Sequence, residues 1–143
     1  SCSLVGSEMC IRDRFSGKRV LLAEDNDLNC EIAEELLSQK GICVEVAGNG
    51  AEAVEKVKNS KPGYYEVILM DIQMPVMDGY EATRQIRSLE DAALAKIPII
   101  ALSANASEED RRASREAGMD GHLAKPIETA KLFGILKEII KKE

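Results

Sequence analysis

The sequence lacks the residue clusters on which zinc sites and disulfide-stapled domains depend. Its four cysteines form no CxxC pair and no other metal-ligand spacing, and it holds a single histidine, His122. A zinc centre needs several cysteine or histidine ligands at short spacing, so this chemistry is excluded. We interpret Cys30 and Cys43 as buried thiols in a reducing compartment.

The chain also lacks long apolar runs and an excess of positive charge. No apolar run is long enough to cross a bilayer and no signal-peptide pattern opens the chain, so we expect a cytoplasmic protein without membrane contact. The net charge of −6 argues against direct binding to nucleic acid. The 143 residues, of which 45% are hydrophobic and 31% charged, suit one soluble globular domain.

Residues 1–17 show no sustained periodicity and end in Ser16-Gly17, so we assign them to a disordered tail or linker. A second interpretation is that this segment is not biological, because GSEMCIRDR resembles the in-frame translation of a transposon-end adapter used to prepare sequencing libraries. Under either interpretation the functional domain comprises residues 18–143.

From Lys18 onward, short apolar segments alternate with stretches of helical periodicity. The apolar segments predict strands at residues 20–23, 42–47, 67–70, 98–102 and 122–124, of which the second alternates like an edge strand. Helices are predicted between the strands and after the last one. This alternation with short connections implies right-handed crossovers and an α/β fold, a doubly wound sheet of five parallel strands with five helices.

Local signals mark where several helices begin and which side they bury. Asn49 with Glu52, and Ser107 with Asp110, have the spacing of residues that cap a helix at its amino end. In the first helix we expect an apolar face to pack on the sheet, formed by Ile32, Ala33, Leu36 and Leu37.

Polar side chains follow the buried strands at the point where each strand ends. Glu24 and Asp25 follow the first strand, Asp71 the third, Ser103 the fourth and Lys125 the fifth. The carboxyl ends of parallel strands meet at one edge of the sheet, so these groups should converge. Each of them alone has an ordinary explanation as a cap, turn or surface residue, but their joint placement at strand ends is difficult to reach by chance.

The types of group in this set indicate phosphoryl transfer. Three carboxylates close together repel one another and favour the binding of a cation. Ligands that are all oxygens suit Mg²⁺, and a neighbouring lysine suits a phosphoryl oxygen. A carboxylate nucleophile beside a divalent cation and an ammonium group has the parts for phosphoryl transfer to an aspartate.

Two other classes of protein are disfavoured. A hydrolase with an aspartyl nucleophile would need a second acid, but Asp71 is followed by Ile72-Gln73 and no cap domain is present. A flavin or dinucleotide binder of similar fold would need a glycine-rich turn after the first strand, and none is found there.

The segments LLAEDN, ILMDIQMPVMDG and ALSA, with the pair Lys125-Pro126, resemble the receiver domain of two-component response regulators. The resemblance runs from about Lys18 to about Lys142. DIQMPVMDGYEATRQIR and GMDGHLAKPI are most similar to receivers carried by hybrid sensor histidine kinases. The resemblance implies a flavodoxin-like fold with the strand order 2-1-3-4-5.

The same resemblance assigns a role to each acidic residue. It implies that Asp71 accepts a phosphoryl group from the phosphohistidine of a histidine kinase or a histidine phosphotransfer protein. The residues implied to hold Mg²⁺ are Asp71, Asp25 as the direct ligand, Glu24 through water and Gln73 through its backbone carbonyl.

Lys125 would pair with the phosphoryl group, and the Lys125-Pro126 bond is expected to be cis. Ser103 matches the switch hydroxyl that moves toward the new phosphoryl oxygen. His122 departs from the common pattern, because many receivers carry a tyrosine or phenylalanine there. We favour a partly exposed histidine with no special role, and a modified switch stays open as the second interpretation.

The implied function is a phosphoacceptor in a phosphorelay. It is not an enzyme in its main role, but it assists its own phosphorylation and slow dephosphorylation. The alternative is a phosphorylation-independent interaction module of the same fold, disfavoured because the acids and the lysine are all present. We allow for a weak dimer, and for either a stand-alone receiver or the receiver of a larger sensor kinase.

Overall fold

The computed structural model describes residues 17–104, 107–125 and 127–141. Within them, five parallel strands form one sheet in the order β2-β1-β3-β4-β5. The strands are β1 (Arg19–Ala23), β2 (Cys43–Ala47), β3 (Val67–Asp71), β4 (Ile99–Ser103) and β5 (Gly121–Ala124). The predicted doubly wound sheet and its strand order are confirmed.

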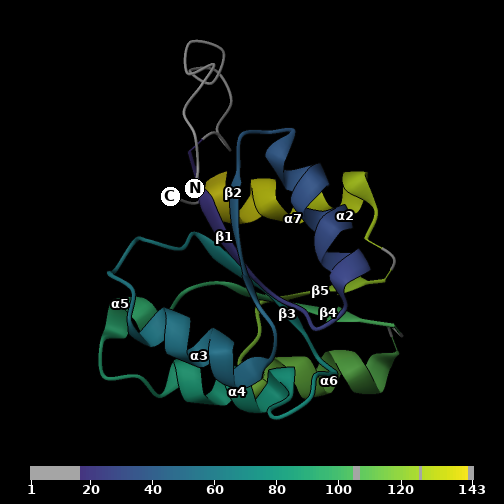
Figure 1. Cartoon of the computed structure of the whole chain (residues 1–143). Helices are drawn as coiled ribbons and strands as arrows, with labels where there is room; N and C mark the ends of the chain where they lie inside the picture. Colours follow the sequence, from purple (N-terminus) through teal and green to yellow (C-terminus); the bar gives the residue numbers. More distant parts are fainter. Residues whose placement is uncertain (1–16, 105–106, 126, 142–143) are drawn as a thin grey trace.

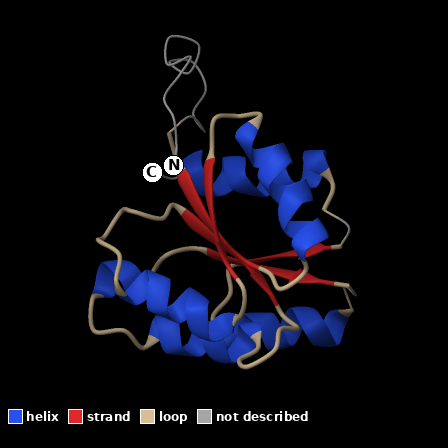
Figure 2. Cartoon of the chain, in the orientation of Figure 1, coloured by secondary structure: helices blue, strands red, loops and turns tan. Residues whose placement is uncertain are grey.

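Helices cover both faces of the sheet, as Figures 1 and 2 show. Those in the described residues are α2 (Asp27–Ser38), α3 (Gly50–Lys58), α4 (Gly79–Arg87), α5 (Ala92–Ala95), α6 (Glu108–Ala117) and α7 (Thr129–Lys141). Helices α2 and α7 lie on one side of the sheet, and α3, α4, α5 and α6 lie on the other. The four-residue helix α5 was not predicted, since one turn is too short to show a period.

Two apolar clusters, one on each face, hold these three layers together. Alternate residues of a strand point to opposite faces, so Leu21 and Met70 join the cluster under α3 and α4, while Leu22 and Leu69 join the cluster under α2 and α7. The strands β3 and β4 are buried along their whole length. This rigid centre fixes the positions of the residues that follow the strand ends.

The predicted helix starts are confirmed by capping hydrogen bonds. The Asn49 Oδ1 atom accepts from the backbone N–H of Glu52 at 2.9 Å, and the Ser107 Oγ atom accepts from that of Asp110 at 3.2 Å. Helix α6 ends at Gly118, whose φ of 108° is in the left-handed region that favours glycine. These local signals need no tertiary information, which is why the sequence reveals them.

Some expectations are corrected by the structure. Ile32 is 40% exposed, because the buried stripe of α2 is formed by Cys30, Ala33 and Leu37, and Leu28 and Ile32 lie on another side of that helix. Cys30 is a free buried thiol as expected, but Cys43 is half-buried and disulfide-bonded.

Two expectations cannot be compared with the structure. The assignments for residues 1–16 and for the Lys125-Pro126 peptide bond fall on positions outside the described residues.

Among the residues that are described, no helix is long and apolar enough to cross a membrane.

Arg87 connects segments that lie far apart in the chain, and no sequence pattern predicted this contact. Its guanidinium group donates to the backbone carbonyls of Gly118 at 2.8 Å and of Ala95 and Ile97 at 2.7 Å each. It also forms an ion pair with Asp120 at 2.7 Å. The end of α4 is thereby fixed to α5 and to the turn that leads into β5.

Candidate functional site

The residues predicted at the strand ends do converge at one edge of the sheet. Asp71 is the last residue of β3, and Glu24, Asp25 and Lys125 directly follow β1 and β5. Glu24 and Asp71 are only 2% and 3% exposed, whereas Asp25 is exposed. The parallel register aligns the ends of the strands, so residues more than fifty positions apart become neighbours.

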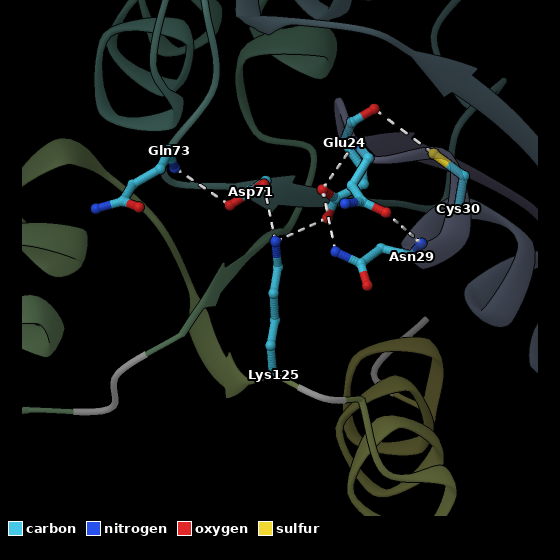
Figure 3. Close-up of polar contacts among 7 residues, drawn as sticks. Glu24, Asn29, Cys30, Asp71, Gln73 and Lys125 are labelled. Carbon is cyan, nitrogen blue, oxygen red and sulfur yellow. Dashed lines mark hydrogen bonds and ion pairs between the residues drawn. The ribbon is translucent and has the colours of Figure 1, made fainter.

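The ammonium group of Lys125 lies between two buried carboxylates, as Figure 3 shows. Its Nζ atom is 2.8 Å from Oδ2 of Asp71 and 2.9 Å from Oε1 of Glu24. The lysine side chain is 21% exposed, so it reaches the pair from the rim of the site. One positive charge thus offsets part of the repulsion between the two acids.

The remaining carboxylate oxygens are held by groups close to them in sequence. Oε2 of Glu24 accepts from the backbone N–H of Asn26 at 3.2 Å and from Nδ2 of Asn29 at 3.4 Å. Oδ1 of Asp71 accepts from the backbone N–H of Gln73 at 3.2 Å. These donors fix the orientation of both carboxylates.

Asn29 is a site residue that the sequence reasoning missed. It lies in the first turn of α2, where its side chain points at Glu24 (Figure 3). The sequence feature that could have identified Asn29 is its position three residues after the capping residue Asn26, close to Glu24 and Asp25. Asparagine is frequent near the start of helices because it caps backbone groups, so this position alone does not indicate a site residue.

Burial and charge set the pKa values of the three groups. Burial, with the nearby charge of Glu24, raises the pKa of Asp71 to about 6, although Lys125 opposes this rise. Burial alone would also raise the pKa of Glu24, but the hydrogen bond and charge of Lys125 outweigh it and lower that pKa. Burial alone would lower the pKa of Lys125, but its bonds to Asp71 and Glu24 raise it.

The donor set fits a hard divalent cation. One carboxylate oxygen from each of Glu24, Asp25 and Asp71 lies within 4.8 Å of the others. All are oxygen ligands, and three acids against one lysine leave the cluster negative, as Mg²⁺ sites require. Asp25 is exposed, which leaves space for the water molecules that Mg²⁺ retains. The role of the Gln73 carbonyl stays a prediction.

Gly79 allows the loop after β3 to return close to the site. A Cβ atom at this position would lie 2.4 Å from the backbone oxygen of Asp71 and 3.0 Å from Cα of Ile72. The backbone N–H of Gly79 donates to the carbonyl of Ile72 at 2.9 Å. Only glycine permits this approach, so the Asp78-Gly79 pair serves the position of Asp71 as well as the turn.

Ser103, predicted as the switch hydroxyl, is in direct contact with His122, for which a switch role was the second interpretation. Oγ of Ser103 lies 2.7 Å from Nε2 of His122. Ser103 is 7% exposed and His122 is half-buried. The imidazole of His122 therefore forms a hydrogen bond with the hydroxyl of Ser103, an interaction that the sequence alone did not indicate.

The fold, the order of the acids and the position of the lysine agree with one family of signalling domains. Residues 20–137 match the model of the response regulator receiver domain. The chain belongs to this receiver family. The receiver is 44% identical over 126 residues to the peroxide stress-activated histidine kinase mak1 of Schizosaccharomyces pombe, and 44% identical over 134 residues to hybrid signal transduction histidine kinase B of Dictyostelium discoideum.

These relatives are much longer than the receiver. The two matches cover 87% of this chain but only 8% of mak1 and 6% of the Dictyostelium kinase. Among solved structures, the receiver domain of the sensor histidine kinase PA1611 from Pseudomonas aeruginosa, with a magnesium ion in its active-site cleft, is 41% identical. The match covers 88% of this chain and 99% of that chain, with a TM-score of 0.79. The family and the likeness to hybrid-kinase receivers are thus established.

A second solved structure shows a receiver with a phosphotransfer partner. It is the complex of the Saccharomyces cerevisiae histidine phosphotransfer protein Ypd1 with the receiver domain of Ssk1. The matched chain is 34% identical, and the match covers 87% of this chain and 89% of that one with a TM-score of 0.78.

Proposed function

We propose that this receiver accepts a phosphoryl group on Asp71 from the phosphohistidine of a histidine kinase or histidine phosphotransfer protein. The observation that carries the proposal is the contact of Lys125 with both Asp71 and Glu24 inside a cluster of three carboxylates. A lone buried aspartate would be a poor nucleophile, because burial favours its protonated form. The amine opposes the effect of burial, so that with a pKa of about 6 most of Asp71 is ionised at neutral pH, and it provides a cation for the phosphoryl oxygens.

The reaction needs little covalent chemistry from the protein. A carboxylate oxygen of Asp71 forms a bond to phosphorus while the bond between phosphorus and the donor imidazole nitrogen breaks, and the imidazole leaves with the electron pair. Lys125 neutralises charge on the transferred group, and the backbone N–H of Gln73 holds the aspartate in position. The product is an acyl phosphate, whose slow hydrolysis would limit the signal in time.

A magnesium ion fits the same cluster. Glu24, Asp25, Asp71 and the backbone carbonyl of Gln73 are the groups that would hold it, and the bound ion would supply positive charge against the phosphoryl oxygens. The magnesium ion reported for the PA1611 receiver domain supports this assignment for the present chain.

Exposed apolar side chains at the same end of the sheet offer a place for the phosphodonor to dock. Leu28 and Ile32 on α2 are 64% and 40% exposed, and Val76 in the loop after β3 is 83% exposed. Val76 also has a φ of 69°, an unfavourable value for a β-branched residue. The complex of Ypd1 with the Ssk1 receiver supports a histidine phosphotransfer protein as this partner.

Binding of beryllofluoride, a mimic of the phosphoryl group, tests the proposal. In the presence of Mg²⁺, fluorine NMR should show a bound signal for the wild type and none for Asp71→Asn. Asp27→Asn is a matched control, because it makes the same change at an acid outside the carboxylate cluster. Equal binding by the wild type and Asp71→Asn would refute the assignment of Asp71.

The alternative is an interaction module that uses the fold without phosphorylation. It predicts that Mg²⁺ changes neither the stability nor the spectra of the protein, whereas a phosphoacceptor site predicts stabilisation that depends on Mg²⁺ concentration. The intact set of acids and lysine favours the phosphoacceptor, because three carboxylates in such proximity are costly unless they bind a cation.

A further inference from the structure

The loop that follows the phosphoacceptor strand is bonded to the start of a helix from an earlier part of the chain. This loop comprises residues 72–78, and it contacts Gly50, the first residue of α3. The backbone N–H of Gly50 donates to the carbonyl of Met77 at 3.1 Å. The first N–H groups of a helix have no partner inside the helix, so the loop supplies the acceptor that this one needs.

Gly50 has no space for a side chain at this contact. A Cβ atom there would lie 2.4 Å from the backbone oxygen of Met77 and 3.0 Å from that of Asp78. Both oxygens belong to the backbone, so the loop itself would have to shift to make room. The backbone of Gly50 is helical, a conformation that alanine adopts readily. Glycine is therefore required here by the close approach of the loop, and not by the conformation of the helix.

The part of the loop that Gly50 holds is strained. The backbone N–H of Met77 donates to the carbonyl of Pro75 at 2.7 Å, and Val76 between them has a φ of 69°. A hydrogen bond over two residues with a positive φ at the central one defines a γ-turn of the rare, strained kind. Such a turn persists only where surrounding contacts maintain it. The bond from Gly50 is one of these contacts, because it holds the residue that closes the turn.

The same loop carries the backbone group that holds the phosphoacceptor. The N–H of Gln73 donates to Oδ1 of Asp71 at 3.2 Å (Figure 3). The two ends of the loop are joined, because the N–H of Gly79 donates to the carbonyl of Ile72 at 2.9 Å. Pro75 restricts its own backbone and that of the residue before it. A displacement of the strained turn is therefore transmitted to Gln73 and little of it is absorbed on the way.

We propose that Gly50 is a positioning residue of the phosphoacceptor site, which holds the strained turn through Met77 and thereby keeps Gln73 in place on Asp71. The inference rests on the proposed function of Asp71. It predicts that the start of α3 sets the affinity of the site for Mg²⁺ and for a phosphoryl mimic, although the carboxylate cluster is formed by residues of other segments. Because coupling between two sites is reciprocal, a ligand of the cluster should also stabilise the contact of Gly50 with Met77.

Gly50→Ala tests this coupling through binding. Calorimetric titration of the metal-free protein should show Mg²⁺ affinity reduced about fivefold, the factor that corresponds to one ordinary net hydrogen bond. Beryllofluoride affinity at saturating Mg²⁺ should fall by a similar factor. Gly48→Ala is the matched control, because it makes the same change two residues earlier. A Cβ atom at Gly48 would meet only the side chain of Glu52, at an ordinary distance of 3.6 Å, so both affinities should equal those of the wild type.

Amide NMR gives a readout that a loss of stability alone would not produce. In the folded, ligand-free protein, Gly50→Ala should shift the amide signals of Gln73 and Gly79, and Gly48→Ala should leave both in place. Hydrogen exchange in the wild type tests the reciprocal effect without any substitution. Mg²⁺ with beryllofluoride should slow exchange of the Gly50 amide more than that of the Glu52 amide, which is bonded to the Asn49 side chain in the same turn of α3.

Three results would overturn the proposal. They are wild-type affinities in a folded Gly50→Ala protein, an equal loss of affinity in Gly48→Ala, and equal slowing of exchange at the Gly50 and Glu52 amides. If Gly50→Ala does not fold, the exchange measurement on the wild type decides. If the wild type binds beryllofluoride and one of these results is found, the role of Gly50 is refuted and the phosphoacceptor assignment stands. If the wild type does not bind beryllofluoride, both are refuted.

Discussion

Replacement of Lys125 by methionine tests the electrostatic account of the site. Methionine is an unbranched side chain one atom shorter than lysine, so the substitution keeps most of the apolar stem and removes the ammonium group with its charge and hydrogen bonds. It leaves the carboxylates of Glu24 and Asp71, whose side chains are 1% and 5% exposed, without their shared cation. Loss of one partner from a buried ion pair costs about 3–5 kcal/mol, and the partial exposure of Lys125 favours the lower end of that range, about 3 kcal/mol.

The destabilisation should depend on pH in a defined direction. In the folded wild type the pKa of Asp71 is raised to about 6, whereas in the unfolded chain this carboxyl loses its proton near pH 4. Between pH 4 and 6 only the folded state holds the proton, so the contribution of Asp71 to the free energy of unfolding falls as pH rises through this range. Without the amine its pKa rises further. Between pH 6 and that higher pKa, Asp71 is protonated in the folded variant but ionised in the folded wild type. The difference in free energy of unfolding between wild type and variant therefore decreases by up to about 1.4 kcal/mol for each unit that pH falls.

Urea denaturation of metal-free protein at pH 6 and pH 8.5 measures both effects. Near neutral pH a loss of about 3 kcal/mol corresponds to a fall in Tm on the order of 10 °C. Mg²⁺ at ten times its dissociation constant should return about 1.4 kcal/mol to the variant, because a cation then replaces the amine. Lys131→Met is the control: its ion pair with Glu128 is 3.6 Å long and exposed, so little change is expected. A deficit independent of pH would refute the reasoning.

Three further predictions concern the frame around the site. Arg87→Ala should lower the free energy of unfolding by about 3 kcal/mol, because it leaves three backbone carbonyls without their donor; a loss below 1 kcal/mol in urea denaturation would contradict this. Gly79→Ala should lower the free energy of unfolding and weaken beryllofluoride binding, because its Cβ atom would clash with the backbone of Asp71. Gly134→Ala is the control: a Cβ atom at this position on α7 meets open space, so the free energy of unfolding should rise by up to about 1 kcal/mol. Val76→Asn should raise the free energy of unfolding by about 0.5–1 kcal/mol, because asparagine tolerates a positive φ better than valine does. The same variant should slow phosphotransfer if the exposed Val76 side chain contacts the donor. A lower free energy of unfolding would show that the backbone at Val76 is not strained.

Predictions from local pattern succeeded where the physical cause is local. The helix caps at Asn49 and Ser107 depend only on residues three positions apart, and the buried strands depend on runs of apolar residues. The convergence of Glu24, Asp71 and Lys125 followed from one further rule, that parallel strands place their carboxyl ends together. The inward placement of Ile32 failed because two apolar stripes exist on α2, and periodicity does not say which one the sheet covers.

The sequence by itself determined the parallel sheet and the group of acids with one lysine at its edge, because these follow from periodicity and chain connectivity, while the order of the strands came from the resemblance to receiver domains. Only the tertiary structure decided how the groups act on one another. The raised pKa of Asp71, the contact of His122 with Ser103 and the bonds of Arg87 depend on burial and on distances of a few ångströms between segments far apart in the chain. Such distances are set by the packing of all the elements at once, and no short stretch of sequence contains them.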